Sequence, residues 1–167
     1  MIIIHSDKVN GISQRIYDET IHGIDLLFLT CPHCNHTGTV VHAYYSRKVK
    51  YKDDVIRLKI LRVKCLFCDK THALLPDTLI PYSRVTMKDT ADIILADTSG
   101  NVRSILQDNL SLDMDDIYRI KRNYRMFWKE RMTSFRLRFD RYLARNCIQI
   151  FKRQFMQIAC TLCGSYG

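Results

Sequence analysis

Two pairs of cysteines, separated by 30 residues, constrain this chain more than any other feature. Each pair has the spacing C-x2-C, Cys31 with Cys34 and Cys65 with Cys68. Two such pairs joined by a β-hairpin can close a tetrahedron of thiolates around one zinc ion, the arrangement of a zinc ribbon. The sequence therefore predicts one structural Zn²⁺ per chain, held by these four residues. Four thiolates leave no open coordination position, so we expect this metal to be non-catalytic.

The first pair, CPHC, also has the spacing of a dithiol redox site, which lies at the start of a helix. After Cys34 the chain continues Asn-His-Thr-Gly-Thr-Val-Val, and a glycine with four β-branched residues disfavours a helix. We therefore favour zinc over thiol chemistry and expect no enzyme. A third pair, Cys160 and Cys163, has no second half, which leaves two free thiols or part of an intermolecular site.

The residue after each pair supports the zinc prediction. In such turns this position often adopts a left-handed backbone conformation. Here it is Asn35 and Asp69, the two non-glycine types that best tolerate that conformation. Four histidines lie near the cysteines and are expected to be packing or surface residues rather than ligands: His33, His36, His42 and His72.

The patterns on either side of residue 85 differ, and together they predict an α+β protein. Residues 31–82 alternate as strands do, with strands expected at 39–45, about 56–62 and 71–75 and a turn at 52–54. From Thr86 to Ala159 there is no proline and one glycine, and Thr86 with Asp89 can cap a helix. We expect a zinc ribbon over 31–82 and a helical domain over 86–167. Residues 1–30 are poorly defined apart from a short strand at 24–29.

Residues 102–125 have the layout of a helix-turn-helix, with a first helix at 102–109 and a second helix capped by Asp113. Ile117 and Ile120 would anchor the inner face of the second helix. The expected nucleic-acid contacts on its outer face and beyond are Tyr118, Arg119, Lys121, Arg122 and Arg125. Asp115 and Asp116, in the first turn, favour the helix dipole but repel phosphate.

The net charge of +9 is uneven along the chain. Residues 31–85 and 117–167 are strongly basic, whereas 86–116 are acidic. A basic excess of this kind favours a polyanionic partner, and DNA is our expectation, with RNA left open. In the ribbon, basic residues alternate with tyrosines and are further expected contacts: Arg47, Lys48 and Lys50.

An apolar stripe at three- and four-residue steps follows the helix-turn-helix and includes Tyr124, Phe127, Trp128, Phe135 and Phe139. Such a stripe packs as a core or forms a dimer seam. The alternative function is therefore a zinc-ribbon protein-interaction or dimerisation module, with a homodimer as one form. No apolar run reaches the roughly 18 residues of a membrane span, and we expect a cytoplasmic protein without membrane contact.

The runs CPHCNHTG, HAYYSRKV and LKILRVKCLFCDKTHALLPDTLIPYS resemble the N-terminal zinc ribbon of bacterial insertion-sequence transposases. They look closest to a group of short proteins, with a domain of unknown function, that share this ribbon and a following helix-turn-helix. The resemblance covers roughly residues 31–125. It implies recognition of the ends of a mobile element, with the four cysteines as zinc ligands and Tyr118, Arg119 and Arg122 facing DNA.

Complete transposases of this kind add a nuclease domain in which a mixed sheet carries three metal-binding carboxylates. No strand pattern follows residue 86 here, and Asp92, Asp97, Asp108 and Asp116 are expected to be surface and cap residues. The resemblance therefore implies DNA recognition without strand transfer.

Overall fold

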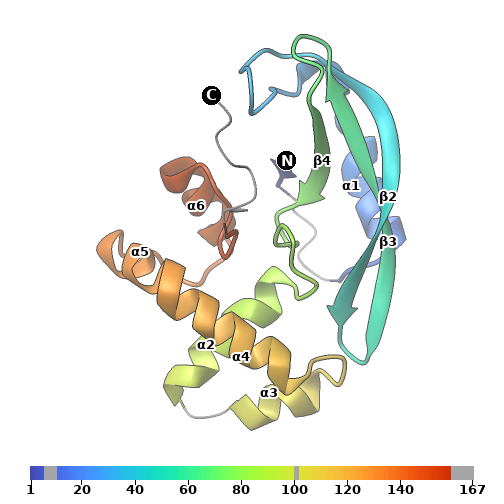
Figure 1. The fold of residues 1–167 in the computed structure, drawn as a ribbon. Coiled ribbons are helices and arrows are strands. Elements are labelled where there is room, and N and C mark those ends of the chain that lie inside the picture. Colours follow the sequence, from blue (N-terminus) through green and yellow to red (C-terminus); the bar gives the residue numbers. More distant parts are fainter. Residues whose placement is uncertain (6–10, 100–101, 159–167) are drawn as a thin grey trace.

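The computed structural model describes residues 1–5, 11–99 and 102–158 of the chain. It is an α+β structure, as the sequence predicted: a four-stranded sheet with α1 beside it, and α2 to α6 gathered on the other side of the molecule (Figure 1). The strand order is β1-β4-β3-β2. Within the described residues no helix is long and apolar enough to cross a membrane. The Cys160/Cys163 pair lies outside the described residues.

A long antiparallel hairpin forms most of the sheet. β2 (Thr39–Tyr51) pairs with β3 (Asp54–Cys65), and Lys52 makes the turn with a φ of 53°. β4 (Thr71–Pro76) pairs with the end of β3. These are the three strands that the alternating pattern predicted, although β2 and β3 are longer than expected.

The first thirty residues complete the sheet, which the sequence did not predict. β1 (Ile2–Ile4) lies parallel to β4, and α1 (Gln14–His22) packs near β3 and β4. The buried hydroxyl of Tyr17 accepts a hydrogen bond from Leu61 N at 2.8 Å and donates one to Leu74 O at 3.1 Å. The strand expected at 24–29 is wrong: Leu26–Phe28 form a 3₁₀ turn, η1, because the Asp25 carboxylate caps the Leu27 N–H.

The helices begin where the capping residues predicted. α2 (Met87–Ser99) follows Thr86, whose hydroxyl accepts from Asp89 N at 3.0 Å. α3 (Val102–Asp108) is followed by α4 (Met114–Asn123), whose Asp113 cap accepts from Asp116 N at 2.8 Å. The helix continues through a π-helical turn, η2 (Tyr124–Trp128), and α5 (Lys129–Ser134), and α6 is Leu143–Phe151.

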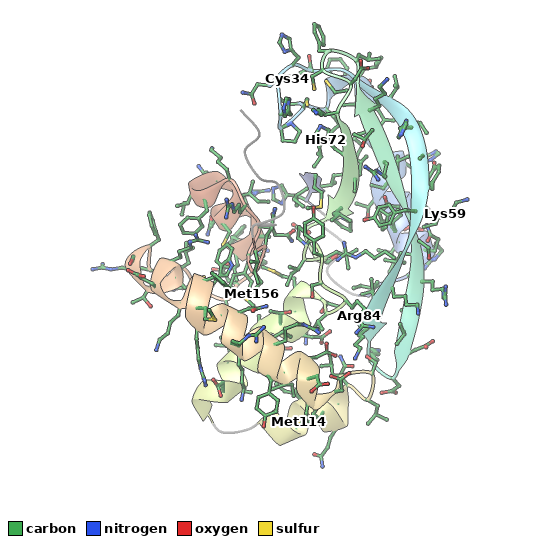
Figure 2. All side chains as sticks on the ribbon, in the orientation of Figure 1. Cys34, Lys59, His72, Arg84, Met114 and Met156 are labelled. Carbon is green, nitrogen blue, oxygen red and sulfur yellow. The ribbon has the colours of Figure 1, made fainter. Side chains whose placement is uncertain are left out.

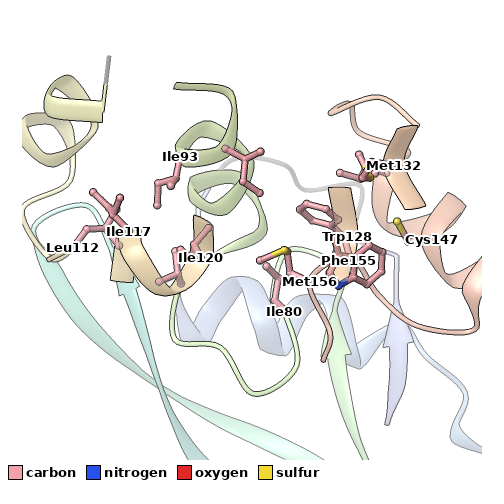
Figure 3. Close-up of a cluster of buried hydrophobic side chains, with 13 residues drawn as sticks. Ile80, Ile93, Leu112, Ile117, Ile120, Trp128, Met132, Cys147, Phe155 and Met156 are labelled. Carbon is pink, nitrogen blue, oxygen red and sulfur yellow. The ribbon is translucent and has the colours of Figure 1, made fainter. Parts of the chain in front are cut away.

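The main apolar core lies among the helices. Trp128 and Phe155 are fully buried and their rings meet edge to face at a centroid distance of 5.3 Å (Figure 3). Cys147 is buried in the same cluster. The apolar stripe predicted to follow the helix-turn-helix is only partly buried, and Phe127 and Phe135 remain exposed. The π turn adds a residue to one helical turn, which rotates the following side chains relative to the core.

Candidate metal centre and candidate nucleic-acid interface

The first cysteine pair forms a tight turn directly before β2. Cys31 O accepts a hydrogen bond from Asn35 N at 2.9 Å, and Cys31 N donates to His36 O at 2.9 Å. The His33 N–H points at Cys31 Sγ at 3.4 Å. The chain after this turn enters β2, so CPHC does not lie at the start of a helix.

The second pair, at the end of β3, repeats these bonds one for one. Cys65 O accepts from Asp69 N at 3.2 Å, Cys65 N donates to Lys70 O at 2.9 Å, and Phe67 N points at Cys65 Sγ at 3.4 Å. Two equivalent turns that face each other are what a zinc ribbon requires.

The backbone after each pair has the predicted left-handed conformation, with a φ of 61° at Asn35 and 59° at Asp69. In each turn this reversal lets the carbonyl of the sixth residue reach back to the N–H of the first cysteine. Both sites therefore favour asparagine, aspartate or glycine over other residues.

The four sulfurs converge on one point at the end of the sheet. All lie within 4.8 Å of one another, and the Cys31–Cys68 and Cys34–Cys65 Sγ separations are both 3.7 Å. A tetrahedral ion with metal–sulfur bonds of about 2.3 Å has sulfur–sulfur edges of about 3.8 Å. The donor set and its spacing thus fit one tetrahedral metal ion.

Without a metal ion, burial and hydrogen bonds shift the pKa values of the cysteine thiols in opposite directions. The backbone N–H groups of Cys68 and Phe67, with burial opposing them, lower the pKa of Cys65 to about 6. At Cys68 the Lys70 amide acts in the same direction, but burial and the neighbouring thiols outweigh it and raise the pKa to about 12. The thiolate of Cys65 is therefore favoured over that of Cys68, and a bound cation would favour deprotonation of both.

His72 is a component of this centre that the sequence did not assign. It is buried on β4, and its Nε2 lies 3.2 Å from Cys31 Sγ (Figure 2). Burial first, and neighbouring positive charges second, lower the pKa of His72, which favours the neutral ring. A neutral imidazole that carries its proton on Nε2 can donate to the Cys31 sulfur and stabilise the thiolate. The register of β4 in the sheet, and not the spacing of residues in the sequence, brings His72 next to Cys31.

The second region of interest is the outward face of α4. Tyr118 is 65% exposed, and Arg122 and Arg125 are exposed on the same side because they follow at i+4 and i+7. Ile117 and Ile120 are buried on the opposite side, as predicted. α2, α3 and α4 share one apolar cluster, an arrangement that is compatible with a helix-turn-helix.

Lys50 is the clearest correction among the expected nucleic-acid contacts. Its ammonium is buried and forms ion pairs with Asp113 at 2.6 Å and Asp116 at 2.5 Å. It is therefore unavailable to phosphate. The Asp113 pKa lies below its usual range because of the hydrogen bond from Lys50. Asp116, expected at the surface, is only 1% exposed, and Arg119 also pairs with it.

The other basic positions divide into paired and unpaired groups. Lys121 and Arg125 both pair with Asp97, at 2.7 and 2.8 Å, which lowers the pKa of that carboxyl. Arg47 on β2 is half-buried and donates to two backbone carbonyls, whereas Lys48 is exposed. The structure thus does not gather the strand residues and the α4 residues on one contact surface.

The family described as "Domain of unknown function (DUF6431)" matches residues 31–119, more than half of the chain, and the protein belongs to it. The matched region runs from the first cysteine into α4. No curated protein and no solved structure matches the chain. These findings do not connect the chain with transposases, so that resemblance stays a prediction.

Proposed function

We propose that this DUF6431 protein binds DNA through the outward face of α4, on a scaffold whose sheet is closed by one structural zinc ion, without catalysing strand transfer. The observation that carries the proposal is the exposed face of Tyr118, Arg122 and Arg125 opposite a helix face that is fully buried. A helix presented in this way fits the major groove, where arginines meet phosphates and guanine edges.

The acidic residues at the start of α4 oppose this binding less than the sequence suggested. Asp113 and Asp116 turn toward Lys50, which sits between the hairpin and α4. The charge of Asp116 is thereby neutralised inside the protein. Asp115 remains exposed in the first turn. Beyond it lie the exposed side chains of Arg122 and Lys129, together with Arg125, whose charge is partly offset by its pair with Asp97.

Zinc is the metal that the cysteine centre supports best. Four thiolates with tetrahedral spacing suit zinc, and iron is the other common ion for this donor set. When bound, the ion would supply folding free energy to the end of the sheet. Elemental analysis of purified protein should give one zinc per chain, and iron in its place would overturn this part of the proposal.

A mobile-element origin is the further part of the proposal, and it rests on the resemblance of the ribbon to that of insertion-sequence transposases. A protein of this origin should prefer the DNA that flanks its own gene. Duplexes from those flanks should bind more tightly than scrambled duplexes of equal length. Equal binding would remove the mobile-element part and leave a non-specific DNA-binding protein.

The test of DNA binding is a salt titration with zinc-loaded protein. Several phosphate contacts predict an affinity that falls steeply with salt. Arg122→Ala should weaken binding about 5- to 100-fold, the range of 1–3 kcal/mol expected for one arginine contact. Arg15→Ala is the matched control, since Arg15 is an exposed arginine on α1, away from α4. A flat salt response, or equal losses in both variants, would contradict the proposal.

A protein-interaction module is the second candidate, and one observation favours it. Apolar side chains stay exposed around the cysteine centre: Leu27, Phe28, Leu66 and Phe67. Gly38 hydrogen-bonds to both Leu29 and Leu66, which brings η1 beside the second cysteine turn. The predicted dimer seam is less favourable, because Trp128 is fully buried within its own chain. Sedimentation at low and high concentration distinguishes a dimer from a monomer.

A further inference from the structure

A pocket of about 490 Å³ lies on the sheet, beside the cysteine centre: Met1 is part of its wall, and the Met1 amino group lies 3.5 Å from Nδ1 of His72. Its wall includes residues of β2, β3 and β4 and of the segment that leads from β4 to α2. The basic and tyrosine side chains of its lining are Tyr45, Arg47, Lys48, Arg62, Tyr82 and Arg84. None of the described lining residues is acidic, so the pocket is strongly positive.

Two backbone carbonyls hold Arg47 in this wall. One of its terminal nitrogens, Nη2, donates to Ile80 O at 2.5 Å and to Ser83 O at 2.6 Å. Burial lowers the pKa of Arg47, and the described residues offer it no carboxylate within ion-pair distance. A partly desolvated cation of this kind gains strongly from an anion.

Arg62 supplies a second guanidinium. Its Nη2 donates to Thr71 Oγ1 at 2.6 Å, whereas its buried Nε has no hydrogen-bond partner within the described part of the chain. Buried donors are rarely left unpaired in folded proteins. Arg62 lines the pocket, and guanidinium groups bind phosphate through two parallel hydrogen bonds.

Tyr82 forms the aromatic rim of the pocket. Its backbone is left-handed, with a φ of 62°, and its side chain is 79% exposed. A bulky residue in this conformation is strained, and such strain is concentrated at binding sites. The two carbonyls that Arg47 binds lie on either side of Tyr82, so Arg47 holds the strained turn in place. Arg84 follows two residues later, on the segment between sheet and helices (Figure 2).

We propose that this pocket binds a nucleoside monophosphate, with the phosphate on Arg47, Arg62 and Arg84 and the base stacked on Tyr82. The volume lies within the range of small-ligand pockets, and a tyrosine beside arginines suits a base next to its phosphate. The ligand is either a free nucleotide or the 5′-phosphorylated end of a strand. This inference does not depend on the proposed contact of α4 with duplex DNA.

The first test is calorimetric titration of the full-length, zinc-loaded protein with adenosine 5′-monophosphate. Adenosine and inorganic phosphate are titrated as the two halves of the ligand. The monophosphate should bind at least ten-fold more tightly than either half. No binding of the monophosphate, or equal binding of adenosine, would overturn the proposal. Equal binding of inorganic phosphate would reduce the pocket to a simple anion site and overturn its nucleotide specificity.

Two variants and one control then locate the binding. Arg84→Ala removes an exposed side chain and should lower the affinity for the monophosphate about ten-fold. Tyr82→Gly relieves the left-handed strain, so it should fold, and it should lose affinity for the monophosphate but not for phosphate. Arg57→Ala, an exposed arginine of β3 outside the pocket, should change nothing. Equal losses in Arg84→Ala and Arg57→Ala would show diffuse charge attraction and overturn the proposal.

A third comparison identifies the source of the ligand. Short single strands with and without a 5′-phosphate are titrated into the wild type and Arg84→Ala. A preference for the phosphorylated strand that disappears in Arg84→Ala would assign the pocket to strand ends. Binding of the free monophosphate without such a preference would assign it to a free nucleotide. Loss of duplex binding in Arg122→Ala with retention of the monophosphate would separate this pocket from the α4 surface.

Discussion

At the end of the sheet where β2 begins and β3 ends, the buried residues include two of the four cysteines, and large apolar side chains such as Phe28 and Phe67 face the solvent. In the helical half the arrangement is reversed, because Trp128 and Phe155 are fully buried among several aromatic rings. The first region has the donor atoms for a metal beside a small apolar cluster, in which Leu61, Val63 and Leu74 are buried. The second has the larger apolar core. We therefore expect the two regions to depend on different sources of stability, the first on a bound metal and the second on its core.

The helical half meets the hairpin at Lys50, near the end of β2. This β2 residue pairs with Asp113 and Asp116 of the helical half, and Lys52 O accepts a hydrogen bond from Ser111 N at 2.9 Å. The tip of the hairpin is therefore fastened to the turn between α3 and α4 (Figure 1). This junction therefore couples the helical half to the tip of the hairpin, at the end of the sheet away from the cysteines.

Removal of the metal should have the largest effect. Structural zinc in small domains supplies an apparent 10–16 kcal/mol, so Cys31→Ser with Cys65→Ser, or a chelator, should unfold the cysteine end. Metal analysis with amide NMR spectra should show loss of zinc and of dispersed ribbon signals. The helical signals should persist. A full metal load in the double variant would contradict the assignment of the ligands.

Truncation of the helical core should have the next largest effect, in the opposite region. Trp128→Ala should lower the free energy of unfolding by about 3–5 kcal/mol because it leaves a large cavity. Trp128→Phe is the control: it keeps a ring and removes an indole N–H that has no partner in the described residues. Chemical unfolding followed by circular dichroism measures both. A metal content unchanged in Trp128→Ala would support two separate sources of stability.

Loss of Lys50 should weaken the junction itself. Lys50→Met leaves the carboxylate of Asp116 buried with only Arg119 beside it, and breaking such a pair costs about 3–5 kcal/mol. Lys88→Met, which breaks an exposed pair with Asp92 on α2, should cost under about 0.5 kcal/mol. Urea unfolding at pH 7 compares the two variants, and similar small losses would disprove a supporting role for the junction.

The Lys50→Met variant also tests how the free energy of unfolding depends on pH. Lys50 lowers the pKa of Asp113 in the folded protein, so this contribution is complete above the unfolded pKa of about 4. It is lost as the pH falls through the lower folded pKa. The difference in unfolding free energy between wild type and Lys50→Met should therefore be constant from pH 7 to 5 and shrink below about pH 4. A difference that grows toward low pH would contradict the pairing.

The smallest effect is expected in the backbone of the first cysteine turn. Asn35→Val places a β-branched residue at a φ of 61° and should cost about 1–2 kcal/mol. Asn35→Gly should be close to neutral, because glycine adopts this conformation without strain. Zinc affinity from competition with a coloured chelator measures both. Equal affinity in the two variants would show that the turn tolerates any residue.

The sequence by itself determined the features that depend on a few neighbouring residues. The cysteine spacing predicted the cluster of sulfurs, Asn35 and Asp69 predicted the left-handed turns, and Thr86 and Asp113 predicted the helix starts. The turns and the helix starts follow from backbone geometry or capping within five residues, and such rules act without knowledge of the rest of the chain. The cluster of sulfurs joins two such turns, and the repeated C-x2-C spacing identifies both of them.

Tertiary structure alone decided the contacts between distant parts of the chain. Asp116 and Lys50 are 66 residues apart, and His72 and Cys31 are 41 apart, so no local pattern records either pairing. The pairing of β1 with β4 and the convergence of Arg47, Arg62 and Arg84 on one pocket depend likewise on strand register. A lysine in the sequence looks the same whether its side chain faces solvent or a buried ion-pair partner. Only the packing of the hairpin against α4 buries Lys50 and leaves Lys48 exposed.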